Sequence, residues 1–194
     1  MKRAIARNDW PRRRLGEATT VLSGATPKTS VAEFWNGEVV WLTPKDLGAL
    51  ESIEVSASER RITQQGFDSC SAQLILPNSV VMSSRAPIGH LAINTLPVCT
   101  NQGCKSFVPK PDLDTRFLYW ALRGVMPDIQ HLGDGCTFDE VSKTDLEAFE
   151  IPVPPLAEQR RLVARIEALT SRLEQARQAR QAALAEAETI LAWV

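Results

Sequence analysis

The 194-residue sequence lacks the features that mark membrane, secreted and metal-binding proteins. No apolar run approaches the roughly 20 residues that a membrane-spanning helix needs. The four cysteines form no Cys-x-x-Cys pair, and we interpret them as reduced, partly buried thiols of a cytoplasmic protein. The two histidines, His90 and His131, lie far apart in the sequence. We therefore expect no metal site, no cofactor and no membrane partner.

Catalytic motifs are also missing. The sequence contains no GxxxxGK[ST], HExxH, GxSxG or GxGxxG motif, which removes the common signatures of nucleotide, zinc and hydrolase chemistry. The carboxylates are scattered, and no pair has a spacing typical of acid–base catalysis. Because a catalytic triad can assemble from distant residues, these absences favour a binding role without excluding an enzyme.

The sequence has no excess of positive charge. Its formal net charge is −1, and its two ends differ from its middle. Residues 1–16 contain six basic residues and one acidic residue, and residues 156–194 contain six arginines and five glutamates. The middle contains ten basic and 17 acidic residues, a net charge of −7. Since DNA-binding domains are usually net basic, any contact with DNA must come from a local patch.

The longest predicted element is a helix that begins at Pro155 and continues to Val194. No proline or glycine follows Pro155, and proline is well tolerated in the first turn of a helix. Apolar residues then recur at steps of four and three, which predicts a heptad seam against a second long helix. This seam consists of Leu162, Ile166, Leu169, Leu173, Ala176, Arg180, Ala183, Ala187, Ile190 and Val194. The polar member, Arg180, is expected to pair with Glu174 or Glu186 across the seam.

The rest of the chain mixes strand and helix patterns. Strands are predicted at residues 38–43, 72–76, 79–83, 90–93 and 149–153, and helices at residues 114–125 and 142–146. Residues 45–48 are predicted as a turn, and residues 61–67 as a helical turn capped by Thr63 and ended by Gly66. We therefore expect an α+β domain over residues 1–153, followed by one long helix over residues 154–194.

Four loops contain small residues, hydroxyl or amide side chains and a cation, at residues 26–29, 43–45, 83–85 and 100–105. Such sets suit phosphates and base edges. The candidate DNA contacts are Lys28, Thr29, Thr43, Lys45, Ser84, Arg85, Asn101, Gln102 and Lys105. The alternative for each residue is that its side chain satisfies backbone groups in a tight turn. The tryptophans are interpreted as packing residues.

Taken in chain order, these segments resemble one half of the DNA specificity subunit of type I restriction–modification systems. The similarity includes residues 15–17, 24–27, 34–35, 40–43, 46–47, 83–89, 100–103 and 135–138. Its most specific stretch is IPVPPLAEQRRLVARIEAL at residues 151–169. At residues 135–138 the family tends to have a Gly-Ser-Thr-Phe-like turn, and Cys136 takes the place of the serine. The resemblance adds Thr137 to the candidate DNA contacts.

The resemblance implies a target recognition domain that reads one half of a split DNA site, followed by a spacer helix. Family members usually contain two such domains and two antiparallel helices, and this sequence shows one of each. We therefore expect a homodimer joined by an antiparallel coiled coil, with Pro155, Leu156 and the seam at its interface, and an inverted-repeat target with an unread spacer. The implied partners are double-stranded DNA, the methyltransferase subunit and the endonuclease/translocase subunit. The chain itself is expected to have no catalytic residues.

Two other readings stay open from the sequence. The chain could be the detached recognition module of a fused restriction–methylation enzyme. It could also be a coiled-coil adaptor whose globular part binds protein, and the net charge of −7 in its middle favours this reading most. Whether the chain is a natural half-length subunit or a truncated product is likewise open.

Overall fold

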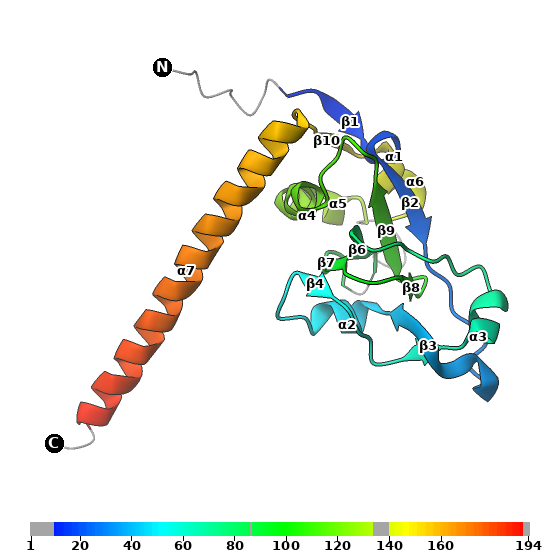
Figure 1. The fold of residues 1–194 in the computed structure, drawn as a ribbon, viewed down its shortest axis with the longest axis horizontal. Helices are drawn as coiled ribbons and strands as arrows, with labels where there is room; N and C mark the ends of the chain where they lie inside the picture. The colour runs from blue at the N-terminus through cyan, green and yellow to red at the C-terminus, as the bar shows by residue number, and fades with distance from the viewer. Residues whose placement is uncertain (1–9, 86, 134–139, 192–194) are drawn as a thin grey trace.

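The computed structural model describes residues 10–85, 87–133 and 140–191 (Figure 1). A mixed α/β domain precedes one long C-terminal helix, α7 (Leu156–Leu191). The predicted fold class is therefore confirmed. No helix in these three ranges is long and apolar enough to cross a membrane.

The central sheet has five strands. Their order is β2 (Thr19–Ser23), β9 (Cys104–Pro109), β6 (Ser79–Ser83), β7 (Leu91–Asn94) and β4 (Glu54–Val55). Neighbouring strands run antiparallel except for β4 and β7, which are parallel. All five residues of β6 are buried, because this strand lies in the middle of the sheet.

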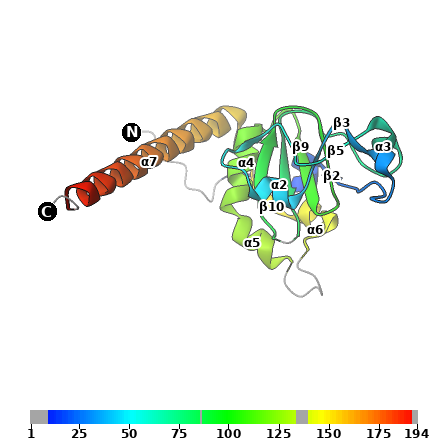
Figure 2. The same cartoon turned by 90° about the horizontal axis from the view of Figure 1, so that it is seen from below.

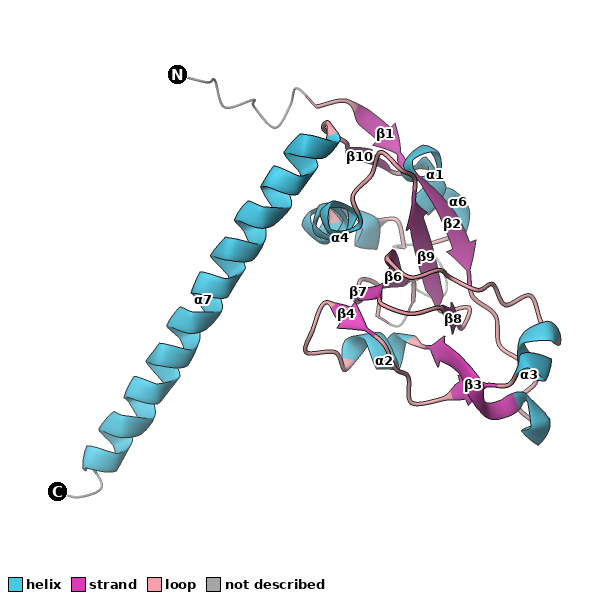
Figure 3. Ribbon diagram, in the orientation of Figure 1, coloured by secondary structure: helices cyan, strands magenta, loops and turns pink. Residues whose placement is uncertain are grey.

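The other strands form two smaller sheets. One contains β5 (Arg61–Ile62), β3 (Trp35–Leu42) and β8 (Val98–Thr100), with β3 and β8 parallel. The other pairs β1 (Arg12–Arg14) with β10 (Glu150–Pro152) in antiparallel register. The β1–β10 pair joins the start of the domain to the residues that lead into α7 (Figure 3).

Short helices surround the sheets. They are α1 (Leu15–Ala18), η1 (Ala32–Phe34), α2 (Pro44–Gly48), α3 (Gln64–Asp68), α4 (Thr115–Gly124), α5 (Met126–His131) and α6 (Lys143–Ala148). Asp114 directly precedes α4 and caps it, because its carboxylate accepts a hydrogen bond from the backbone N–H of Phe117. Its buried face, including Phe117 and Leu122, packs in one core with Val80 and Phe107 of the central sheet.

Three local predictions were wrong. Gly66 lies inside α3 and does not end it. A glycine is needed here for another reason, since a Cβ at this position would lie 2.4 Å from the Phe34 carbonyl oxygen. Residues 72–76 form only an isolated bridge, between Ile75 and Val98. The predicted turn at residues 45–48 belongs to α2. Thr63 caps α3 as predicted.

Helix α7 contacts the domain at its base and then leaves it (Figure 2). Its first turn begins at Pro155, whose carbonyl accepts hydrogen bonds from the N–H groups of Glu158 and Gln159 at 2.8 and 3.1 Å. Val163 is buried, and Leu162 packs against the main core. Residues 168–189 are exposed. The helix is therefore docked over about three turns and unsupported beyond them.

Candidate nucleic-acid interface

The four predicted loops converge on one region of the domain. Asn101 donates its N–H to the Leu42 carbonyl at 2.9 Å, which places residues 100–105 beside the start of α2. The N–H of Ala25 bonds to the Thr100 carbonyl at 2.9 Å, and the N–H of Ser84 bonds to the Gly103 carbonyl at 2.8 Å. We call residues 24–30, 43–46, 84–85 and 100–105 the loop cluster.

Gly24 permits the closest approach within the loop cluster. A Cβ on this residue would lie 1.9 Å from the Asn101 carbonyl oxygen and 2.3 Å from the Thr100 hydroxyl oxygen. Next to it, the Thr26 hydroxyl donates a hydrogen bond to the Gln102 side-chain oxygen. Any side chain at Gly24 would therefore separate two of the loops.

Two tryptophans hold the first loop in place. The indole N–H of Trp41 donates to the Ala25 carbonyl at 2.9 Å, and that of Trp35 donates to the Lys28 carbonyl at 3.3 Å. The two rings meet edge to face at 5.1 Å, and the Arg60 guanidinium lies 3.6 Å from the Trp35 ring centroid. Both rings are buried packing groups, as predicted. They leave Lys28 exposed at the surface.

Thr43 and Asn101 build the turns on which they lie. Thr43 and Asp46 form a capping box at the start of α2, in which the Asp46 carboxylate accepts from the Thr43 N–H at 2.8 Å. The Asn101 side-chain oxygen accepts a hydrogen bond from the Gly103 N–H at 3.0 Å. These are the turn-forming contacts that the sequence left open as an alternative.

Lys105 is the buried cation of the loop cluster and is only 6% exposed. Its ammonium donates to the Ser84 hydroxyl and the Gln102 carbonyl, each at 3.2 Å, and lies 3.5 Å from a Glu140 carboxylate oxygen. The second Glu140 oxygen lies 3.3 Å from the Arg85 guanidinium. Glu140 was not predicted, since 35 and 55 residues separate it from its partners.

Three of the four cations of the loop cluster face carboxylates. Lys45 lies 2.6 Å from Glu59, and this hydrogen bond raises the pKa of Lys45. Arg85 and Lys105 share Glu140. Of the predicted cations, Lys28 has no ion pair within the described part of the chain.

The other predicted contacts differ in exposure. Thr29 and Gln102 are exposed, and Ser84 is buried. Thr137 lies outside the described residues.

Replacing Lys105 by methionine is expected to loosen the loop cluster. The change leaves the Gln102 carbonyl without its donor and Glu140 without one of its two cations, so we expect a loss of about 2 kcal/mol of unfolding free energy. Hydrogen exchange at the amides of residues 84 and 101–104 should accelerate. The exposed Lys110, at the other end of β9, gives the matched control Lys110→Met. Equal exchange in both variants would contradict the role of Lys105.

Two buried cysteines, Cys99 and Cys104, have thiols of low reactivity. Burial raises the pKa of both Cys99 and Cys104 to about 12. Their thiols are therefore protonated near neutral pH and are poor nucleophiles. Within residues 10–85, 87–133 and 140–191, no three His, Cys, Asp or Glu side chains gather as a metal site would require.

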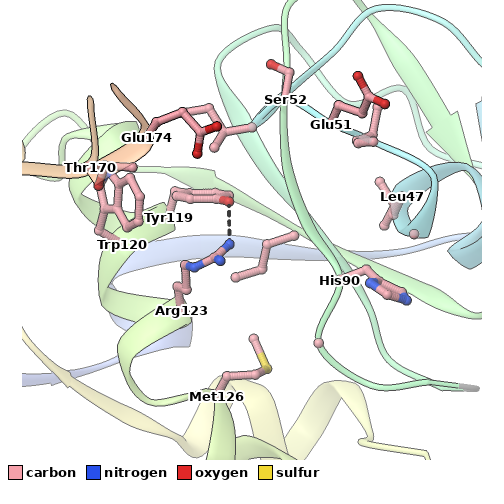
Figure 4. A pocket seen from close by; sticks show the side chains of 15 residues that line it. Leu47, Glu51, Ser52, His90, Tyr119, Trp120, Arg123, Met126, Thr170 and Glu174 are labelled. Carbon is pink, nitrogen blue, oxygen red and sulfur yellow. Dashed lines mark hydrogen bonds between the residues drawn. The ribbon is translucent and has the colours of Figure 1, made fainter. Parts of the chain in front are cut away.

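A cavity of about 690 Å³ separates α7 from the domain. Thr170 and Glu174 of α7 lie on one side, and Glu51 and His90 lie on the other (Figure 4). Arg123 donates a hydrogen bond to the Tyr119 hydroxyl at 3.1 Å. The side chains that line the cavity include both acidic and basic groups, so they form no cluster of like charges that would bind a ligand of the opposite charge.

The domain itself covers part of the predicted dimer interface, which consists of Pro155, Leu156 and the seam. Leu156, Leu162 and Ile166 are half-buried. Leu169 and Leu173 are 55% and 53% exposed. The remaining described members are exposed, namely Pro155, Ala176, Arg180, Ala183 and Ala187, whereas the side chain of Ile190 is outside the description.

Leu184 is a seam candidate that the heptad pattern missed. It is 53% exposed and lies 11 residues after Leu173. A straight helix returns to nearly the same face after about 11 residues, or three turns, so Leu184 continues the face of Leu173 better than Ala183 does.

Known proteins similar to this chain identify its family. A family model for the type I restriction modification DNA specificity domain matches residues 7–182. The chain belongs to this specificity family. The specificity subunit of the type I restriction enzyme MjaIX from Methanocaldococcus jannaschii is 34% identical over 156 residues, which are 79% of this chain and 36% of that protein. The EcoR124I/EcoR124II specificity subunit of Escherichia coli is 31% identical, over 77% of this chain and 38% of that protein.

Solved structures of the specificity family share the fold. The HsdS subunit from Thermoanaerobacter tengcongensis matches with a TM-score of 0.70 and 25% identity, over 88% of this chain and 39% of that one. A chain from a structure on complex assembly and conformational transition of the type I R-M system matches with a TM-score of 0.71 and 28% identity, over 88% and 40%. This chain therefore spans about two-fifths of the length of such relatives.

Proposed function

We propose that this chain is a non-catalytic DNA-recognition unit of a cytoplasmic type I restriction–modification complex. Residues 1–153 would form the target recognition domain and residues 154–194 the spacer helix. The observation that supports this role best is the convergence of four loops, distant in sequence, into the loop cluster. Their hydroxyl, amide and cationic groups match the chemistry of phosphates and base edges.

Within the loop cluster, exposed and buried residues would have different tasks. Lysines would contact phosphates, whereas Arg85 and Gln102 have the side chains that pair with guanine and adenine edges in the major groove. Ser84, Lys105, Thr43 and Asn101 would hold the loops in shape through the contacts described above. The proposed DNA-facing residues are Lys28, Thr29, Lys45, Arg85, Gln102 and Thr137.

The proposed active form is a homodimer with an antiparallel coiled coil along α7. Half-exposed leucines on an isolated helix support this, since such a stripe is stable in water when a partner covers it. A two-fold dimer would read two inverted half-sites separated by unread base pairs. Methyltransferase subunits would dock near Pro155 and Leu156, and the endonuclease/translocase subunit would join that complex.

Selection from a random pool of DNA duplexes tests the proposal. The chain, alone and with its cognate methyltransferase subunit, is expected to enrich two inverted copies of one sequence at a fixed spacing. Failure to enrich any sequence in either form would overturn the proposal. It would favour instead the protein-binding adaptor, which the carboxylates beside Lys45, Arg85 and Lys105 also support.

Lys28→Ala is expected to weaken binding to all selected sequences equally. Removing one phosphate contact should lower the slope of log affinity against log salt by about 1, with unchanged base preference. Titration of a labelled duplex at several salt concentrations measures this slope. Lys110→Ala, which removes an exposed lysine outside the loop cluster, serves as the control. An equal change in both variants would show that Lys28 makes no local contact.

A further inference from the structure

Gln159 anchors the first turn of α7. Its side chain is fully buried. Its amide oxygen accepts from the Asp114 N–H at 2.8 Å, and its amide nitrogen donates to the carbonyls of Asp112 and Pro154 at 3.0 and 2.8 Å. The bonds to Asp112 and Asp114 join α7 to the segment that begins α4, and the bond to Pro154 holds the residues just before the helix, so together they fix where the long helix starts.

Arg116 of α4 makes a second anchor. One guanidinium nitrogen lies 2.7 Å from Glu167 of α7, and the other lies 2.5 Å from Glu54 of β4. The Arg116 side chain is 42% exposed, so the contribution of its ion pairs to overall stability is modest. Its planar fork nevertheless binds two carboxylates in fixed directions, which a single ammonium group cannot do. Arg116 thereby ties the helix to the edge of the central sheet.

The two anchors together define the direction of α7. Gln159 and Glu167 are eight residues apart, or about 12 Å along the helix axis. Within the described residues, Glu167 is the last residue of α7 that makes a hydrogen bond or ion pair with the domain. Beyond it, Thr170 and Glu174 face the open cavity (Figure 4). Loss of the Arg116 contact would leave the base of α7 held by Gln159 and by the apolar contacts of Leu162 and Val163, so the angle of the helix would be held less firmly.

A small tilt has a large effect at the far end of the helix. From Gln159 to residue 189 the axis measures about 45 Å, so a tilt of roughly 10° moves the far end by about 8 Å. Successive base pairs are about 3.4 Å apart along a DNA strand. A tilt of this size at the base of α7 therefore moves the far end of the helix by the length of about two base pairs of DNA.

We propose that Arg116, with Glu54 and Glu167, is a positioning clamp that sets the angle of α7 and thereby the spacer length of the split DNA target. This inference rests on the proposed function. The clamp shares no hydrogen bond or ion pair with the loop cluster in the described chain, so it should affect spacing and leave half-site reading unchanged.

The test uses duplexes with inverted copies of the half-site that the wild-type protein selects. The spacer length varies in steps of one base pair. The wild-type protein should discriminate by about tenfold or more against a neighbouring spacer length, whereas Arg116→Ala and Glu167→Gln should bind neighbouring lengths within about threefold. Arg161→Ala is the matched control, because Arg161 pairs at 2.6 Å with Glu158 inside α7 and makes no ion pair with any described residue of the domain.

The outcomes separate the inference from the function on which it rests. If both clamp variants keep the wild-type spacing, the inference is overturned and the proposed function stands. A changed half-site would also overturn it, since the clamp would then act on base reading. If the wild-type protein selects no split site, the proposed function fails and the inference fails with it. Glu167→Gln removes only a charge, so this variant guards against misfolding of Arg116→Ala.

Discussion

Replacing Gln159 by alanine is expected to lower the free energy of unfolding by about 3 kcal/mol. The substitution leaves one backbone N–H and two carbonyls without the partner that the buried Gln159 side chain provides. Each unsatisfied buried group costs about 1–3 kcal/mol, and water that enters the new space recovers part of this loss. Urea denaturation of wild-type and variant proteins measures the difference.

The control for this prediction is Gln175→Ala. Gln175 lies on the same helix and is exposed, so its replacement should change the unfolding free energy by less than about 0.5 kcal/mol. Similar losses for the two variants would mean that a general effect of the substitution on α7, and not the buried amide, explains the result. A stable Gln159→Ala protein would show that Gln159 is not the anchor of α7.

Replacing Leu173 by aspartate is expected to dissociate the proposed homodimer. Leu173 is 53% exposed in the isolated chain and lies near the middle of α7. Two-fold symmetry places each substitution in the interface twice, and burial of an unpaired carboxylate costs several kcal/mol, so the dissociation constant should rise by more than about 100-fold. Light scattering over a range of protein concentrations measures this change.

Ala182→Asp gives the matched control for the dimer. Ala182 is exposed and lies nine residues from Leu173, which places it on about the opposite face of the helix. The same charge on this face should leave the dimer intact. A wild-type protein that is monomeric at micromolar concentration would refute the dimer, and equal dissociation by both variants would refute the assigned face.

Local signals in the sequence predicted much of the fold. Pro155 marked the start of α7, and Thr63 marked the first turn of α3. These features act within about one helical turn, so a short window of sequence contains the information. The wrong prediction at Gly66 has a different cause, since this glycine serves the approach of Phe34 from another segment.

Contacts between distant segments could not be predicted in this way. The sequence selected Arg85 and Lys105 but gave no sign that Glu140 pairs with both. It placed Gln159 in a specific motif without indicating that this side chain is buried against the start of α4. Such partnerships depend on how the sheet brings segments together, and helical periodicity or motif spacing does not encode them.

The ion pairs of the loop cluster would affect how such a protein searches DNA for its target. Glu140 faces both Arg85 and Lys105, and Glu59 faces Lys45, so two carboxylates offset two of these three positive charges before any DNA arrives. Contact with an arbitrary phosphate would then exchange one ion pair for another, so few counterions would be released and residence on non-target DNA would be short. Only a sequence that also satisfies the base-reading groups would hold the protein. Modest attraction to bulk DNA would thus favour rapid sampling of many sites.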